Sequence, residues 1–83
     1  MSDEEFDVLD ELYFVKHFNE LLQDSTLSKE EILPALRTLY DKGWIKVLRS
    51  PDEEILEKLD LTSSFQEYYY LATKKGLLAH NQI

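Results

Sequence analysis

The segment from Ser28 to Arg49 constrains the fold most, because it joins a capped helix directly to a β-strand. Glu31 follows Ser28 at the spacing of a capping box, in which the two side chains satisfy main-chain N–H groups at a helix start. Gly43 is a common residue just beyond a helix end. Residues 44–49 include tryptophan, isoleucine and valine, which are favoured in strands. The sequence therefore predicts a helix over 28–42 and a strand over 44–49.

This helix carries an apolar stripe at helical spacing, formed by Ile32, Leu36, Leu39 and Tyr40. Pro34 lies inside the helix, where proline costs roughly 3 kcal/mol of helix propensity. We therefore expect either a kink at Pro34 or a later helix start. With the stripe directed inward, Pro34 and Thr38 lie at the centre of the outward face, with acidic residues beside them: Glu30, Glu31 and Asp41.

The first 24 residues are helical in composition but present two apolar stripes on opposite sides of a straight helix. Phe6, Leu12 and Tyr13 group with Leu9, whereas a second set falls on the other side: Phe14, Phe18, Leu21 and Leu22. A single helix would expose one of these stripes. We therefore predict a break near 15–17, with a first helix over 4–13 and a second over 17–23.

The last third of the chain predicts a hairpin and a final helix. Residues 52–64 form an acidic insert that could hold a helical turn over 54–59, and the tyrosine-rich segment 65–72 predicts a returning strand. Thr73 is a candidate cap for a helix over 74–80. The expected fold class is α+β, with a single domain over 1–83 in which a bundle of three helices precedes two strands and a C-terminal helix.

Three segments in this order resemble winged helix-turn-helix domains of transcription regulators: LSKEEI (27–32), ALRTLYDKGWI (35–45) and YYLATKKG (69–76). The middle segment resembles the third helix and first wing strand of that family. The last resembles its returning strand, Tyr-x-Leu-Thr-x-x-Gly, with one extra residue. The resemblance implies a three-helix bundle with a two-stranded β-wing, in which the helix after the turn enters the DNA major groove. The long acidic wing loop departs from the family, which often has basic residues there.

The charge distribution does not match DNA binding. The formal net charge is −8, with eight acidic residues and one basic residue in 1–24. The outward face of the third helix and the wing loop are both acidic, whereas phosphate contacts by basic residues normally supply most non-specific DNA affinity. We therefore expect a protein-interaction module. The alternative is a DNA-binding transcriptional regulator that uses a basic ridge of Arg37, Lys42, Lys46 and Arg49, with Lys29 and Thr38 as further DNA-contact candidates.

Three surfaces are candidates for a protein partner or a homodimer. Pro34 and Thr38 mark the outward face of the third helix. In the returning strand, one interpretation places Tyr69 in the core, and the other makes Phe65, Tyr68 and Tyr70 an apolar contact patch. The C-terminal residues Leu77, Leu78 and Ile83 form a further candidate surface for dimerisation, and Trp44 is expected in the core.

No pattern in the sequence indicates an enzyme. There is no cysteine, and the histidines His17 and His80 are far apart, so we interpret both as solvated surface residues and expect no metal site. The glycines are isolated, so no phosphate-binding loop is expected. Neither a cofactor nor a small-molecule ligand is implied. The short apolar runs and the acidic start predict a cytoplasmic chain without a membrane span or secretory signal.

Overall fold

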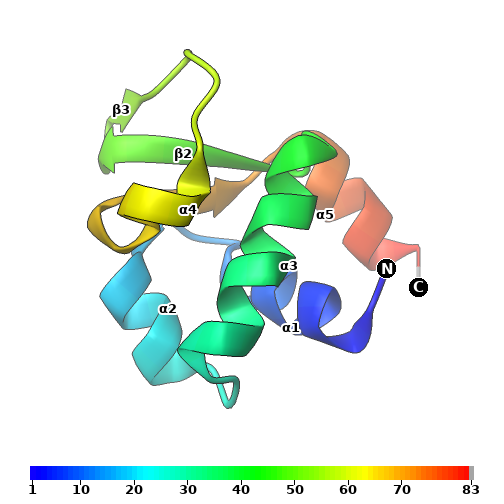
Figure 1. The fold of residues 1–83 in the computed structure, drawn as a ribbon. Helices are drawn as coiled ribbons and strands as arrows, with labels where there is room; N and C mark the ends of the chain where they lie inside the picture. Colours follow the sequence, from blue (N-terminus) through cyan, green and yellow to red (C-terminus); the bar gives the residue numbers. More distant parts are fainter. Residues whose placement is uncertain (83) are drawn as a thin grey trace.

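In the computed structural model, which describes residues 1–82, the chain forms five α-helices, one 3₁₀ turn and four strands (Figure 1). The helices are α1 (Asp3–Glu11), α2 (Phe18–Asp24), α3 (Lys29–Asp41), α4 (Leu61–Ser64) and α5 (Lys74–Asn81), with a 3₁₀ turn, η1 (Phe65–Glu67), after α4. The strands are β1 (Lys16–His17), β2 (Ile45–Ser50), β3 (Glu53–Glu54) and β4 (Tyr69–Ala72). They form one antiparallel sheet in the order β1-β4-β2-β3. The molecule is therefore a small α+β domain, as predicted.

Capping boxes set the starts of the first three helices. The pairs Ser2–Glu5, His17–Glu20 and Ser28–Glu31 each exchange side-chain and main-chain hydrogen bonds at a helix N-terminus. The predicted capping box at Ser28 is confirmed, and the four predicted helices are present with bounds within two residues of those expected. Pro34 lies within a continuous α3.

The predicted break in the first 24 residues is confirmed, and it contains a strand that the sequence did not predict. Lys16 and His17 pair with Tyr70 and Tyr69 of β4. The N–H of Ala72 also donates to the carbonyl of Leu12 at 2.9 Å. This pairing satisfies main-chain groups of the non-helical segment and holds the α1–α2 connection against the sheet.

Two expectations for the last third are wrong. The returning strand spans only Tyr69–Ala72, because residues 61–67 form α4 and η1 instead. No helical turn forms over 54–59, where β3 is followed by irregular chain. Ile55 there is buried, and its N–H donates to the carbonyl of Val47 at 2.9 Å. Burial of this one side chain thus ties the acidic insert to the sheet.

The core lies between the helices and one face of the sheet (Figure 1). Val47, Tyr70 and Ala72 contribute the sheet side, and T-shaped packing of Phe18 on Phe65, with ring centroids 5.1 Å apart, joins α2 to η1. The buried residues of the three-helix layer are Val8, Leu9, Leu12, Phe18, Leu21, Ile32, Ala35, Leu36 and Leu39. They include members of both apolar stripes that the sequence presents, which explains why the chain breaks between α1 and α2.

Close packing joins α5 to the start of β2. A Cβ atom on Gly76 would lie 2.1 Å from the carbonyl oxygen of Trp44, so only glycine fits there. That carbonyl also accepts from the N–H of Thr73 at 2.9 Å, and the Thr73 hydroxyl donates to the carbonyl of Gly43 at 2.8 Å. The Trp44 side chain is half-buried against the core, less deeply than the sequence suggested.

Candidate interaction surface

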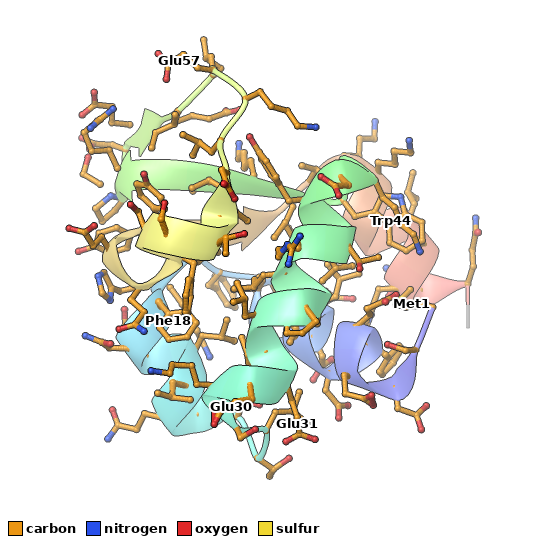
Figure 2. The ribbon with its side chains drawn as sticks, viewed as in Figure 1. Met1, Phe18, Glu30, Glu31, Trp44 and Glu57 are labelled. Atoms are coloured by element: carbon orange, nitrogen blue, oxygen red, sulfur yellow. The ribbon has the colours of Figure 1, made fainter. Side chains whose placement is uncertain are left out.

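The outward face of α3 lies on the surface, as predicted. Glu30, Glu31, Pro34 and Asp41 are exposed and Thr38 is half-buried. Figure 2 shows Glu30 and Glu31 projecting from the N-terminal end of α3. The apolar stripe on the opposite side of the helix is buried, except that Tyr40 is half-buried. Most of this face is therefore not covered by any other part of the described chain.

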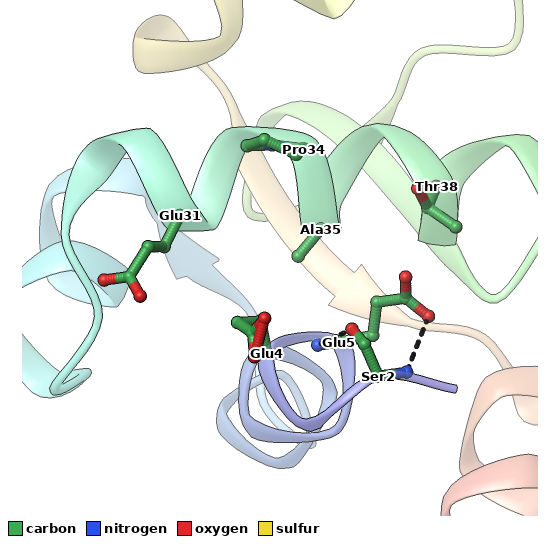
Figure 3. A pocket seen from close by; sticks show the side chains of 7 residues that line it. All are labelled: Ser2, Glu4, Glu5, Glu31, Pro34, Ala35 and Thr38. Atoms are coloured by element: carbon green, nitrogen blue, oxygen red, sulfur yellow. Dashed lines mark hydrogen bonds between the residues drawn. The ribbon is translucent and has the colours of Figure 1, made fainter.

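A shallow groove of about 190 Å³ separates this face of α3 from the N-terminal turn of α1 (Figure 3). Ala35 forms part of the groove and is only 4% exposed. Its lining combines three carboxylates with small or apolar side chains: Ser2, Glu4, Glu5, Glu31, Pro34, Ala35 and Thr38. The groove is thus acidic at its edges and apolar at its centre.

Local hydrogen bonds keep two of these carboxylates in place. Glu31 accepts from the N–H and the hydroxyl of Ser28, at 3.0 and 3.1 Å. These bonds hold the pKa of Glu31 below its usual range. Glu5 accepts from the N–H of Ser2 at 3.3 Å. The capping boxes at the starts of α1 and α3 therefore hold both carboxylates in position as hydrogen-bond acceptors.

Acidic residues accompany most members of the basic ridge. Lys42 lies 3.7 Å from Glu5, Lys46 lies 3.6 Å from Glu54, and Arg49 lies 3.8 Å from Glu53. A fourth pair, Lys58 with Asp41 at 3.7 Å, joins the loop after β3 to α3.

Arg37 and Lys29 differ from these paired residues. Both are exposed, and neither forms an ion pair within residues 1–82. Asp60 lies close enough to Arg37 for the two to interact: the pKa of Asp60 is lowered mainly by its hydrogen bond from Thr62, with a smaller contribution from Arg37. Arg37 is thus partly compensated, whereas Lys29 remains a free positive charge.

A second depression, of about 110 Å³, lies between α3 and the end of the loop after β3 and includes Arg37 and Asp60. Tyr40 forms its central contact, because its hydroxyl accepts from the N–H of Leu59 at 3.0 Å and donates to the carbonyl of Glu57 at 3.4 Å. These bonds dock the loop on α3. The depression therefore lies beside the contacts that hold this loop on α3.

The predicted aromatic patch is wrong. Phe65 is 8% exposed and Tyr70 is fully buried, so neither is available to a partner, and Tyr68 is half-buried. The hydroxyl of Tyr70 donates to the carbonyl of Phe65 at 2.6 Å, and burial raises the pKa of Tyr70 well above its usual range. Alternation along β4 is as predicted, but Tyr70, and not Tyr69, faces the core.

Of the C-terminal residues proposed for dimerisation, Leu77 packs against the core and Leu78 is 53% exposed, whereas Ile83 lies outside the described residues. Phe14 and Leu56 are the most exposed large apolar side chains among those described. Leu56 is in the loop after β3 and Phe14 is in the α1–β1 connection. Self-association stays a prediction.

The two histidines are structural, which corrects the expectation that both are solvated. His17 caps α2 by accepting from the N–H of Asn19 at 3.1 Å. His80 is only 9% exposed and stacks on Phe6 with ring centroids 4.2 Å apart. The spacing of Gly76, Leu77 and His80 along one helical face is the sequence signal that could have indicated this burial. Within the described chain, no group of three or more potential ligands is arranged to hold a metal ion.

Comparison of the chain with protein-family models, with curated proteins and with solved structures found no match. The described part of the chain also has no helix that is both long and apolar enough to cross a membrane.

Proposed function

We propose that the chain is a non-enzymatic winged-helix domain that acts through contacts with another protein. The element order supports this fold: three helices precede the antiparallel strands β2 and β4, and a C-terminal helix follows. In this order α3 corresponds to the helix that winged-helix regulators place in the DNA major groove. The function of the domain then depends on what the outer face of α3 and the wing can contact.

The pairing of the basic ridge with acidic residues is the observation that carries this proposal. Lys42, Lys46 and Arg49 each have a carboxylate within 4 Å. A phosphate approaching any of these residues would compete with that carboxylate and be repelled by it. Exposed ion pairs are weak, so the pairs themselves add little stability. They act instead on the electrostatic potential of the surface, which therefore lacks the continuous positive stripe that DNA binding requires.

The remaining charges on these surfaces support the same conclusion. Glu30, Glu31 and Asp41 are exposed on the outer face of α3, and Asp52 and Glu57 are exposed on the wing. Figure 2 shows Glu57 at the tip of the wing loop. Both regions that contact DNA in the winged-helix family therefore present negative charge, which favours a protein partner over a nucleic acid.

A DNA-binding regulator is the second candidate, because Lys29 and Arg37 are exposed on α3. Neither has an ion-pair partner among residues 1–82. Together they could contact a phosphate and a base edge.

Titration of labelled, mixed-sequence duplex DNA at about 50 mM salt, followed by fluorescence anisotropy, distinguishes the two functions. We expect no binding at micromolar protein concentrations. Micromolar binding that weakens steeply with added salt would instead establish the DNA-binding alternative.

A variant tests whether the acidic partners of the basic ridge are what prevents DNA binding. Glu5→Gln, Glu53→Gln and Glu54→Gln together remove the carboxylates beside Lys42, Lys46 and Arg49. The matched control, Asp3→Asn, Asp7→Asn and Glu20→Gln, removes three charges elsewhere on the surface. We expect salt-sensitive DNA binding in the first variant and none in the control. Equal behaviour of the two variants would show that ion pairing does not determine the choice of partner.

A further inference from the structure

The groove between α1 and α3 has the chemistry to hold a long cationic side chain. We propose that it receives a lysine or arginine from a basic segment of the partner protein, an inference that rests on the proposed function. The groove opens at the outer face of α3 and has carboxylates contributed by both helices (Figure 3). Its occupant would therefore contact α1 and α3 together.

The centre of the groove suits the aliphatic part of such a side chain. Pro34 and Ala35 contribute apolar surface, and Thr38 lies one helical turn beyond Pro34 on the same side of α3. Lysine and arginine bury their methylene chains on apolar surface while their charged ends stay among polar groups. A volume of about 190 Å³ accommodates one such chain and excludes a folded element.

The edges of the groove suit the charged end. Glu4 and Glu5 come from the first turn of α1, and Glu31 comes from the first turn of α3. Glu4 forms no ion pair within the described residues. Glu5 pairs with Lys42, but the distance from Oε1 to Nζ is 3.7 Å, which is long for an ion pair. An arriving ammonium or guanidinium group would thus meet carboxylates that are not fully neutralised.

Charge complementarity selects a basic partner over a second copy of this chain. The net charge of −8 attracts a basic segment at long range, and two copies repel each other. Helices α1 and α3 both belong to the N-terminal half of the chain, which is rich in acidic residues. A second copy that docked through this half would therefore bring further acidic side chains to the groove. An oligolysine or oligoarginine peptide is therefore a suitable probe.

The test is a titration of ¹⁵N-labelled protein with oligolysine and with oligoarginine at about 50 mM salt, followed by NMR amide shifts. We expect saturable shifts concentrated at Glu5, Glu31, Ala35 and Thr38. Shifts spread evenly over the outer face of α1 and the wing, or no shifts at all, would overturn the proposal. In either case the DNA titration still decides the proposed function separately, because it reports on the basic ridge and not on the groove.

Matched variants separate the groove from general charge attraction. The groove variant carries Glu4→Gln, Glu5→Gln and Glu31→Gln, and glutamine keeps both capping boxes. The control carries Glu20→Gln, Glu53→Gln and Glu57→Gln, which loses the same charge away from the groove and includes a third capping-box glutamate. We expect roughly tenfold weaker peptide binding for the groove variant than for the control. Equal weakening would refute a specific site, and circular dichroism verifies that both variants are folded.

Discussion

The hydroxyl of Tyr13 lies 2.7 Å from Nδ1 of His80 and joins the turn after α1 to the end of α5. The same hydroxyl donates to Oδ1 of Asn81 at 2.9 Å. The tautomer of His80 sets which of the two atoms, the Tyr13 hydroxyl or His80 Nδ1, donates the hydrogen between them. His80 Nε2 lies 3.2 Å from the carboxylate of Asp10, although no hydrogen bond forms there. The last helix is thus fixed to the first by a polar cluster beside the stacked ring of Phe6.

The first prediction concerns this cluster. Tyr13→Phe removes one hydroxyl that makes two hydrogen bonds, and we expect it to lower the free energy of unfolding by about 1–2 kcal/mol. Tyr69→Phe is the control, because the Tyr69 hydroxyl makes no hydrogen bond within residues 1–82. Urea denaturation followed by circular dichroism measures both. Equal stability of the two variants would show that the cluster does not hold α5.

The second prediction concerns the contact between α5 and Trp44. Gly76→Ala would place a Cβ atom 2.1 Å from the carbonyl oxygen of Trp44, so α5 must move away from β2. We expect a loss of about 2–3 kcal/mol, although alanine is the better helix former.

Gly43→Ala is the comparison for this prediction. Gly43 has a φ of 74° but open space around its Cβ position, so the substitution there costs only backbone strain, about 1 kcal/mol. Thermal unfolding ranks the two variants. A Gly43 variant less stable than the Gly76 variant would contradict the assignment of close packing at α5.

These examples show which parts of the fold the sequence determines locally. The bounds of α3 follow from Ser28, Glu31 and Gly43, whose effects act within one helical turn. Strand β1 could not be predicted, because two residues carry no periodicity and pair only once β4 is in place. The burial of Tyr70 in place of Tyr69 depends on the register of β4 with β2, which a run of three tyrosines leaves open.

The candidate surface also has features that the sequence predicts and features that depend on the tertiary fold. The solvent exposure of Glu30, Glu31 and Pro34 could be predicted from helical periodicity alone. The groove could not, since it depends on how the first turn of α1 lies beside α3. The pairing of Lys46 and Arg49 with Glu54 and Glu53 required the short strand β3, which forms only when the acidic insert folds back on β2.

The third prediction concerns Pro34. Pro34→Ala restores a main-chain donor to the carbonyl of Glu30 and replaces the poorest helix former by the best. We expect α3 to become more stable and the free energy of unfolding to rise by about 1–3 kcal/mol. The upper value is the full difference in helix propensity between proline and alanine. Thr38→Ala is the control, because it improves helix propensity without adding a hydrogen bond and should give less than about 1 kcal/mol. Urea denaturation measures both, and a destabilised Pro34 variant would show that proline relieves some strain in α3.

The last prediction is the pH dependence due to Glu31. The hydrogen bonds from Ser28 lower the pKa of Glu31 in the folded state below its ordinary value of 4.5. A group with a lowered folded-state pKa stabilises the fold fully above its unfolded pKa, and loses this contribution as the pH falls through the folded value. We therefore expect the stability difference between the native chain and Glu31→Gln to be constant from neutral pH to about pH 5 and to shrink below it. Urea midpoints measured for both chains across this range test the expectation. A difference that grows on acidification would show that the folded state favours protonated Glu31, which would contradict the capping geometry at the start of α3.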